Sequence, residues 1–119
     1  ASLAVVLAAS LPLGLTAHAK PTFTVQNDSE NEVLVRIYHD DEATCMSGLN
    51  MKTVPLGETK TLSCKNDLKD RCLVQLLVNG RIACSRNHGP CSDRAIKMLN
   101  GSKLIFAQRD NGKYVCRIE

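Results

Sequence analysis

Hydrophobic and polar residues alternate along most of the chain after residue 20, with the period of two that is typical of β-strands. In Glu32–His39, for example, Val33, Val35 and Ile37 would share one face of a strand. Eight segments carry such a strand pattern: Thr22–Asn27, Glu32–His39, Met51–Val54, Thr59–Lys65, Arg71–Val78, Arg81–Ser85, Lys103–Gln108 and Lys113–Ile118. The pattern predicts a mainly β fold, an antiparallel β-sandwich or small barrel of about seven to eight strands.

Turn-forming residues separate these segments and predict which strands pair. Asn79-Gly80 and Asn111-Gly112 each join two apolar runs, and Asn-Gly is the strongest short signal for a β-hairpin with a type I′ turn. The polar link Asp28–Asn31 and the Pro-containing and Gly-containing link Pro55–Glu58 also read as hairpin connections. The first four strands are therefore expected to pair in sequence order, as two hairpins.

One segment departs from the β pattern. Ser92 and Asp93 form a good helix N-cap with an early acid, and Asn100-Gly101 follows as a C-cap. The residues Ser92–Leu99 are therefore predicted to form one short helix of about two turns, acting as a crossover or a lid.

The first nineteen residues contain no charged side chain and end in Ala17-His18-Ala19. An apolar run followed by small residues at these spacings is typical of a signal peptide whose N-terminal part is missing here. We expect residues 1–19 to be this signal peptide and residues 20–119 to be a single disulfide-stabilised β domain. The protein is therefore predicted to be secreted or periplasmic.

Six cysteines lie after residue 20: Cys45, Cys64, Cys72, Cys84, Cys91 and Cys116. An even number of cysteines in an exported chain predicts three disulfides, and a zinc site is disfavoured because no C-x-x-C pair occurs. Six cysteines allow fifteen pairings. Loop lengths favour Cys84–Cys91 and Cys64–Cys72, which leaves Cys45 to pair with Cys116. The first of these bonds would clamp the loop Ser85–Pro90.

Charge is distributed unevenly between the two halves. Residues 20–58 hold three basic and seven acidic side chains, whereas residues 59–119 hold twelve basic and five acidic ones. The second half is therefore the part expected to meet anions. Its basic residues Arg81, Arg86, Arg94, Lys97, Arg109 and Lys113 would allow electrostatic capture of an anionic surface or polymer, without sequence-specific recognition of a nucleic acid.

The clamped loop suggests a recognition site. A rigid exposed loop loses little entropy on binding, so the predicted binding residues are Arg86, Asn87 and His88 with Arg94 and Lys97 of the adjacent helix. The expected function is that of a non-enzymatic binding protein, resembling an inhibitor or an effector, whose partner is another protein.

Two alternatives stay open. His39 and His88 would be the acid and base of a small secreted hydrolase such as a ribonuclease, if they converge. The chain would otherwise be a structural component of the cell surface. The sequence predicts no cofactor and no metal, since the acidic run after His39 lacks the ligand spacing of a calcium loop.

Two tripeptides have the N-glycosylation pattern, Asn27-Asp28-Ser29 and Asn100-Gly101-Ser102. Both fall in predicted turns, and they matter only in a eukaryote.

Overall fold

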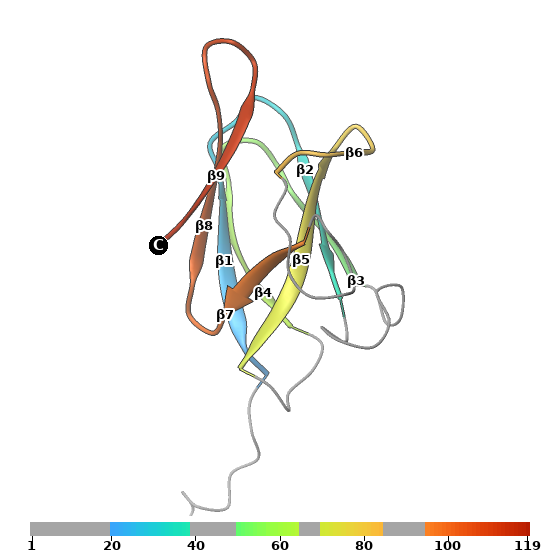
Figure 1. Cartoon of the computed structure of the whole chain (residues 1–119), viewed down its shortest axis with the longest axis vertical. Helices are drawn as coiled ribbons and strands as arrows, with labels where there is room; N and C mark the ends of the chain where they lie inside the picture. The colour runs from blue at the N-terminus through green and yellow to red at the C-terminus, as the bar shows by residue number, and fades with distance from the viewer. Residues whose placement is uncertain (1–19, 39–49, 65–69, 85–94) are drawn as a thin grey trace, which may run out of the picture.

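The computed structural model describes residues 20–38, 50–64, 70–84 and 95–119, and these residues form nine β-strands (Figure 1). Sheet A has the strand order β4-β1-β8-β9, and sheet B has the order β3-β2-β5-β6 with β7 also paired to β5. The strands are β1 (Thr22–Asn27), β2 (Val33–Ile37), β3 (Asn50–Val54), β4 (Thr59–Ser63), β5 (Arg71–Val78), β6 (Arg81–Ile82), β7 (Ile96–Leu99), β8 (Lys103–Gln108) and β9 (Tyr114–Ile118). The predicted mainly β fold is confirmed.

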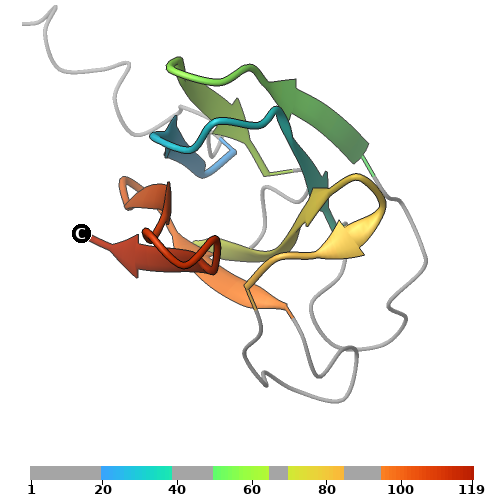
Figure 2. The same ribbon diagram turned by 90° about the horizontal axis from the view of Figure 1, so that it is seen from above.

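The two sheets enclose the larger of two hydrophobic clusters among the described residues, as in a β-sandwich (Figure 2). Sheet A contributes Phe23, Val25 and Phe106, while sheet B contributes alternate residues of β2 and β5. The alternation read from the sequence selects these inward positions, because successive side chains of a strand point to opposite faces. Burial of such apolar side chains stabilises the fold by roughly 1.5–3 kcal/mol each.

The two predicted hairpins between the first four strands do not form. Strand β1 pairs with β4 and β8 in sheet A, whereas β2 pairs with β3 and β5 in sheet B. The link 28–32 and the link Pro55–Glu58 therefore cross from one sheet to the other. Alternation of apolar and polar residues shows that each of two strands buries one face. Strands that face each other across the core have the same alternation as strands paired in one sheet, so the pattern does not show which strands pair.

One strand pair also differs from the antiparallel arrangement that the sequence predicts. Strand β1 pairs with β8 in parallel, from Thr24 opposite Lys103 to Asn27 opposite Phe106. The two strands are far apart in the sequence, so the connection between them is long enough for a parallel crossover. The other six pairs among the described strands are antiparallel.

The predicted helix Ser92–Leu99 is wrong where the structure describes it. Residues Ile96–Leu99 form β7, whose register against β5 runs from Ile96 opposite Val74 to Leu99 opposite Arg71. Ile96 and Met98 are fully buried, and their spacing of two residues suits a strand. Pairing with the edge of β5 therefore outweighs the local cap signals. The described residues contain no helix.

Both Asn-Gly hairpins form, with different turns. Asn79 and Gly80 have φ angles of 52° and 79°, which confirms the type I′ turn between β5 and β6. Between β8 and β9 only Gly112 has a positive φ, and its N–H donates to the carbonyl of Arg109. The second connection is therefore a type I turn followed by a glycine bulge, which is a longer hairpin loop than the one predicted.

Two disulfides lie within the described residues. Cys64–Cys72 joins the end of β4 to β5, as predicted. Cys84 bonds to Cys116, so the predicted pairs Cys84–Cys91 and Cys45–Cys116 are both wrong. Cys84 follows an edge strand of sheet B and Cys116 lies in the edge strand of sheet A, so the fold brings together cysteines that are 32 residues apart.

Several predictions lie outside the described residues: the signal peptide 1–19, the bonding of Cys45 and Cys91, and the loop Ser85–Pro90. The two disulfides are consistent with an extracellular or periplasmic protein. The described part of the chain contains no helix with the length and apolar character needed to cross a membrane.

Candidate functional site

A concave basic surface lies where the edge strands of the two sheets meet. It consists of two adjoining hollows, of about 660 and 400 Å³, that share Ala83, Lys113 and Tyr114. We call this surface the basic cleft. Its lining residues are Val78, Asn79, Arg81, Ile82, Ala83 and Cys84 from the β5–β6 hairpin and the residues after it, and Arg109, Lys113, Tyr114, Val115 and Cys116 from the β8–β9 hairpin.

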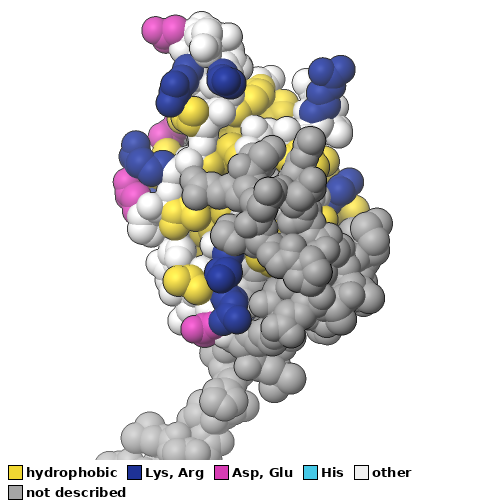
Figure 3. Space-filling model, in the orientation of Figure 1, with side chains coloured by type: hydrophobic (Ala, Val, Ile, Leu, Met, Phe, Trp, Pro, Cys, Tyr) yellow, Lys and Arg dark blue, Asp and Glu magenta, His cyan; other side chains and the backbone are white. Residues whose placement is uncertain are grey.

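Three cations line the basic cleft. Arg81, Arg109 and Lys113 are exposed, and no acidic residue is among the lining residues. None of the three forms an ion pair within the described part of the chain, where the ion pairs involve Arg71 and Arg117. Figure 3 shows Lys and Arg side chains on both sides of exposed hydrophobic atoms at the upper end of the molecule. The cleft therefore has a positive potential that suits an anionic ligand.

Tyr114, the aromatic residue that lines the basic cleft, is held in place by two contacts. The Tyr114 ring stacks on the buried Phe106 ring, with centroids 5.0 Å apart and 13° between the ring planes. Its hydroxyl accepts a hydrogen bond of 2.7 Å from the Asn31 side-chain amide. A ring fixed in this way presents a flat surface without a large loss of side-chain entropy on binding.

The two sides of the basic cleft are also fixed relative to each other. The type I′ turn at Asn79-Gly80 sets the position of Arg81, which pairs with Val78 across the hairpin. The Cys84–Cys116 disulfide then joins this side covalently to β9. The cleft is therefore formed before any ligand arrives, which lowers the entropic cost of binding.

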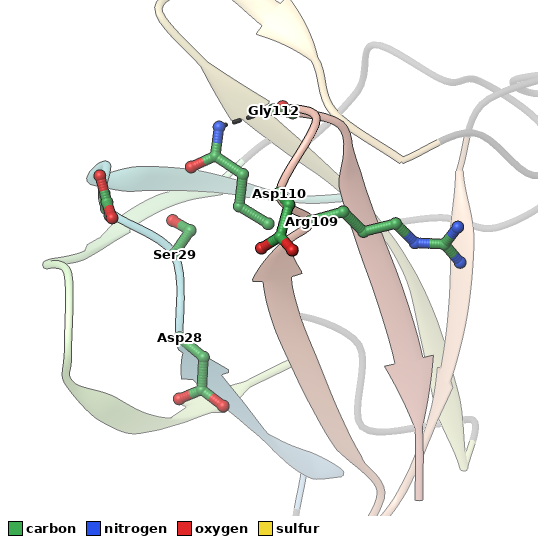
Figure 4. A pocket seen from close by; sticks show the side chains of 7 residues that line it. Asp28, Ser29, Arg109, Asp110 and Gly112 are labelled. Atoms are coloured by element: carbon green, nitrogen blue, oxygen red, sulfur yellow. Dashed lines mark hydrogen bonds between the residues drawn. The ribbon is translucent and has the colours of Figure 1, made fainter.

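A second hollow, of about 380 Å³, lies beside the basic cleft on the other side of the β8–β9 turn (Figure 4). Its carboxylates are Asp28 and Glu30 from the link after β1, and Asp110 from the turn. The Asp28 carboxylate accepts a hydrogen bond of 2.8 Å from the side-chain amide of Gln26, and the Gln108 side-chain amide donates to the Gly112 carbonyl. This hollow is therefore acidic and polar.

Arg109 lines both the acidic hollow and the basic cleft. In Figure 4 its side chain extends away from Asp28 and Ser29, so the guanidinium does not neutralise the carboxylate of Asp28. The β8–β9 turn thus separates an acidic surface from a basic one. Arg109 contributes its charge to the basic side.

No group of three or more His, Cys, Asp or Glu side chains within the described ranges is placed to hold a metal ion. The three carboxylates of the acidic hollow are therefore too dispersed to act together as ligands of one cation.

Four of the five predicted binding residues lie outside the described part of the chain. Arg86, Asn87, His88 and Arg94 lie outside the described residues, as does His39. Lys97 is exposed on β7 and lines none of the three hollows. The Cys84–Cys91 bond that was expected to clamp Ser85–Pro90 does not exist, because Cys84 bonds to Cys116.

The residues of the basic cleft carry a signal in the sequence, although the predicted site does not include them. Arg81, Arg109 and Lys113 all belong to the basic second half of the chain, and each lies beside an Asn-Gly turn. Hairpins place such residues at the ends of strands. What the sequence does not show is that the two hairpins lie at the same end of the molecule, side by side.

Relatives do not identify the function of this surface. No model of a known protein family matches the chain, and no curated protein is significantly similar to it. The chemistry of the basic cleft is therefore the basis on which a function can be assigned.

Proposed function

We propose that this chain is an exported, non-enzymatic binding protein that uses the basic cleft to hold an acidic segment of a partner protein. One observation carries the proposal: Arg81, Arg109 and Lys113 converge from two sheets on one concave surface whose described lining contains no carboxylate. Carboxylate side chains of a partner would supply the opposite charges that the cleft lacks.

The other lining residues support a protein partner over a simple anion. Tyr114 and the arginines are of the residue types that dominate binding energy at protein interfaces. Ile82, Ala83 and Val115 add apolar area between the charges. A mixed surface of this kind suits a peptide that carries acidic and apolar side chains in turn.

Export is the second part of the proposal. The two disulfides, together with the signal-peptide pattern of residues 1–19, favour an oxidising compartment. The small domain gains stability from covalent links, and the cleft itself depends on one of them.

The test measures binding of a synthetic peptide of alternating Glu and Leu residues by titration calorimetry. The double variant Arg81→Glu/Lys113→Glu should weaken binding at least about tenfold, which corresponds to about 1.4 kcal/mol. Raising the salt concentration should weaken the binding of the unmodified protein, because exposed charges are screened.

The matched control is Lys97→Glu/Lys103→Glu, which makes the same change in net charge outside the cleft. It should change the affinity by less than about twofold, since long-range charge effects are screened at physiological salt. If the control weakens binding as much as the cleft variant, or if the peptide does not bind at all, the proposed site is wrong.

A further inference from the structure

The two glycosylation tripeptides occupy opposite environments in the fold. Asn27 is fully buried at the end of β1. Its amide nitrogen donates hydrogen bonds to the carbonyls of Asn31 (2.7 Å) and Val54 (3.0 Å), which uses both of its hydrogens. Its side-chain oxygen accepts from the backbone N–H and the hydroxyl of Ser29. A sugar on this nitrogen would replace one of the two hydrogens, so one of these bonds would be lost, and the fully buried side chain leaves no space for the sugar.

Asn100 is exposed in the turn between β7 and β8. Its side-chain oxygen accepts a hydrogen bond of 3.0 Å from the backbone N–H of Thr22. Its amide nitrogen donates no hydrogen bond to any described residue. The bond from Thr22 fixes the side chain without using the nitrogen, so a substituent on that nitrogen leaves the folded structure intact.

We propose that Asn100, and not Asn27, carries an N-linked oligosaccharide when this chain passes through a secretory pathway that glycosylates proteins. The donor is a lipid-linked oligosaccharyl pyrophosphate. The Nδ2 nitrogen of Asn100 loses one proton and bonds to the anomeric carbon of the first sugar. The bond from that carbon to the pyrophosphate oxygen breaks, and the lipid pyrophosphate leaves with the electron pair.

The timing of the transfer explains why the folded state selects the site. The sugar is attached to the chain before the tripeptide is fixed in a folded turn, so both asparagines are chemically accessible at first. A chain modified at Asn27 would have to bury a sugar at a fully buried position and would lose one of the two bonds that this nitrogen donates, so it would not reach the native fold. A chain modified at Asn100 folds normally.

The proposed glycan lies far from the basic cleft. The β7–β8 turn is at the lower end of the molecule, whereas the β5–β6 and β8–β9 turns that form the cleft are at the upper end (Figure 1). A glycan on Asn100 therefore leaves the cleft open. The inference shares the assumption of export with the proposed function, but it does not depend on the cleft.

The test is secretion of the full chain from a eukaryotic host, followed by an endoglycosidase that leaves the first sugar on each modified asparagine. A retained sugar separates glycosylation from spontaneous deamidation, to which an Asn-Gly pair is prone. Peptide mass spectrometry should find the sugar on Asn100 and none on Asn27. A sugar on Asn27 in folded material, or an unmodified Asn100, overturns the proposal.

The variant Ser102→Ala removes the acceptor pattern and keeps the bond between Asn100 and Thr22. It should abolish the glycan without changing the melting temperature of enzymatically deglycosylated protein. Binding of the acidic peptide is measured on the same material. The two proposals therefore fail separately. An unmodified Asn100 contradicts only the glycan proposal, and absence of peptide binding contradicts only the proposed function of the cleft.

Discussion

At the scale of single residues, Asn27 is a fully buried polar side chain that organises the links between the sheets. Its four side-chain hydrogen bonds hold the link after β1 in shape and connect it to Val54 of β3. Its backbone adds two more bonds, one from its N–H to Glu58 and one to its carbonyl from Gly57. Asn27 therefore ties together the two links that cross between the sheets.

Replacing Asn27 with alanine should lower the free energy of unfolding by about 3 kcal/mol, because the carbonyl of Val54 and the N–H of Ser29 lose buried partners. Urea denaturation measures the loss. The neighbouring variant Gln26→Ala, at a half-buried side chain, removes one exposed hydrogen bond and should cost no more than about 0.5 kcal/mol. Equal effects of the two variants would show that Asn27 has no special role.

At the scale of elements, β5 organises sheet B. It pairs with β2 along one edge and with both β6 and β7 along the other, and its residues Cys72–Val78 are buried on both faces. The apolar run of this segment, interrupted only by the buried Gln75, is typical of such a central strand. The same strand explains why Ile96–Leu99 is extended, since β7 completes the edge that the short β6 leaves unpaired.

Two substitutions in the β5–β6 turn test whether backbone conformation alone fixes this hairpin. In Gly80→Ala the added methyl group meets no atom within 4 Å, so the cost arises from the positive φ of 79°. Thermal or urea unfolding should show a loss of roughly 1–2 kcal/mol. Asn79→Gly, at a φ of 52°, should be neutral within a few tenths of a kcal/mol. A neutral Gly80→Ala would mean that the turn changes shape.

At the scale of the whole molecule, the two described disulfides connect different parts of the fold. Cys64–Cys72 closes a short loop between consecutive strands of the sequence, whereas Cys84–Cys116 joins the edges of the two sheets. The second bond also forms part of the wall of the basic cleft. Stability and ligand binding should therefore both depend on it.

Loop lengths predict the size of the two effects. Replacing Cys84 and Cys116 with alanine should cost about 4 kcal/mol, and replacing Cys64 and Cys72 about 2.5 kcal/mol, because the longer loop restricts the unfolded chain more. Urea denaturation of the two double variants gives the comparison. The first variant should also bind the acidic peptide more weakly. If the short loop contributed more stability, the account based on loop entropy would be wrong.

The sequence by itself determined the local structure of this protein. Alternation located eight of the nine described strands, and Asn-Gly pairs located both hairpin turns. Cys64 and Cys72 pair as their short spacing predicts, although the same argument is wrong for Cys84 and Cys91. These features depend on side chains and backbone angles of residues close together in the chain, so a single sequence records them.

Only the tertiary structure decided which strands share a sheet, which distant cysteine pairs with Cys84, and that Ile96–Leu99 is a strand. It also placed Arg81 and Lys113 on the walls of one hollow, which makes the basic cleft. Each of these outcomes depends on how the two sheets bury their apolar faces against each other. Residues that share a buried face need not be neighbours in the chain, and hydrophobic burial is non-directional, so the local pattern does not specify their partners.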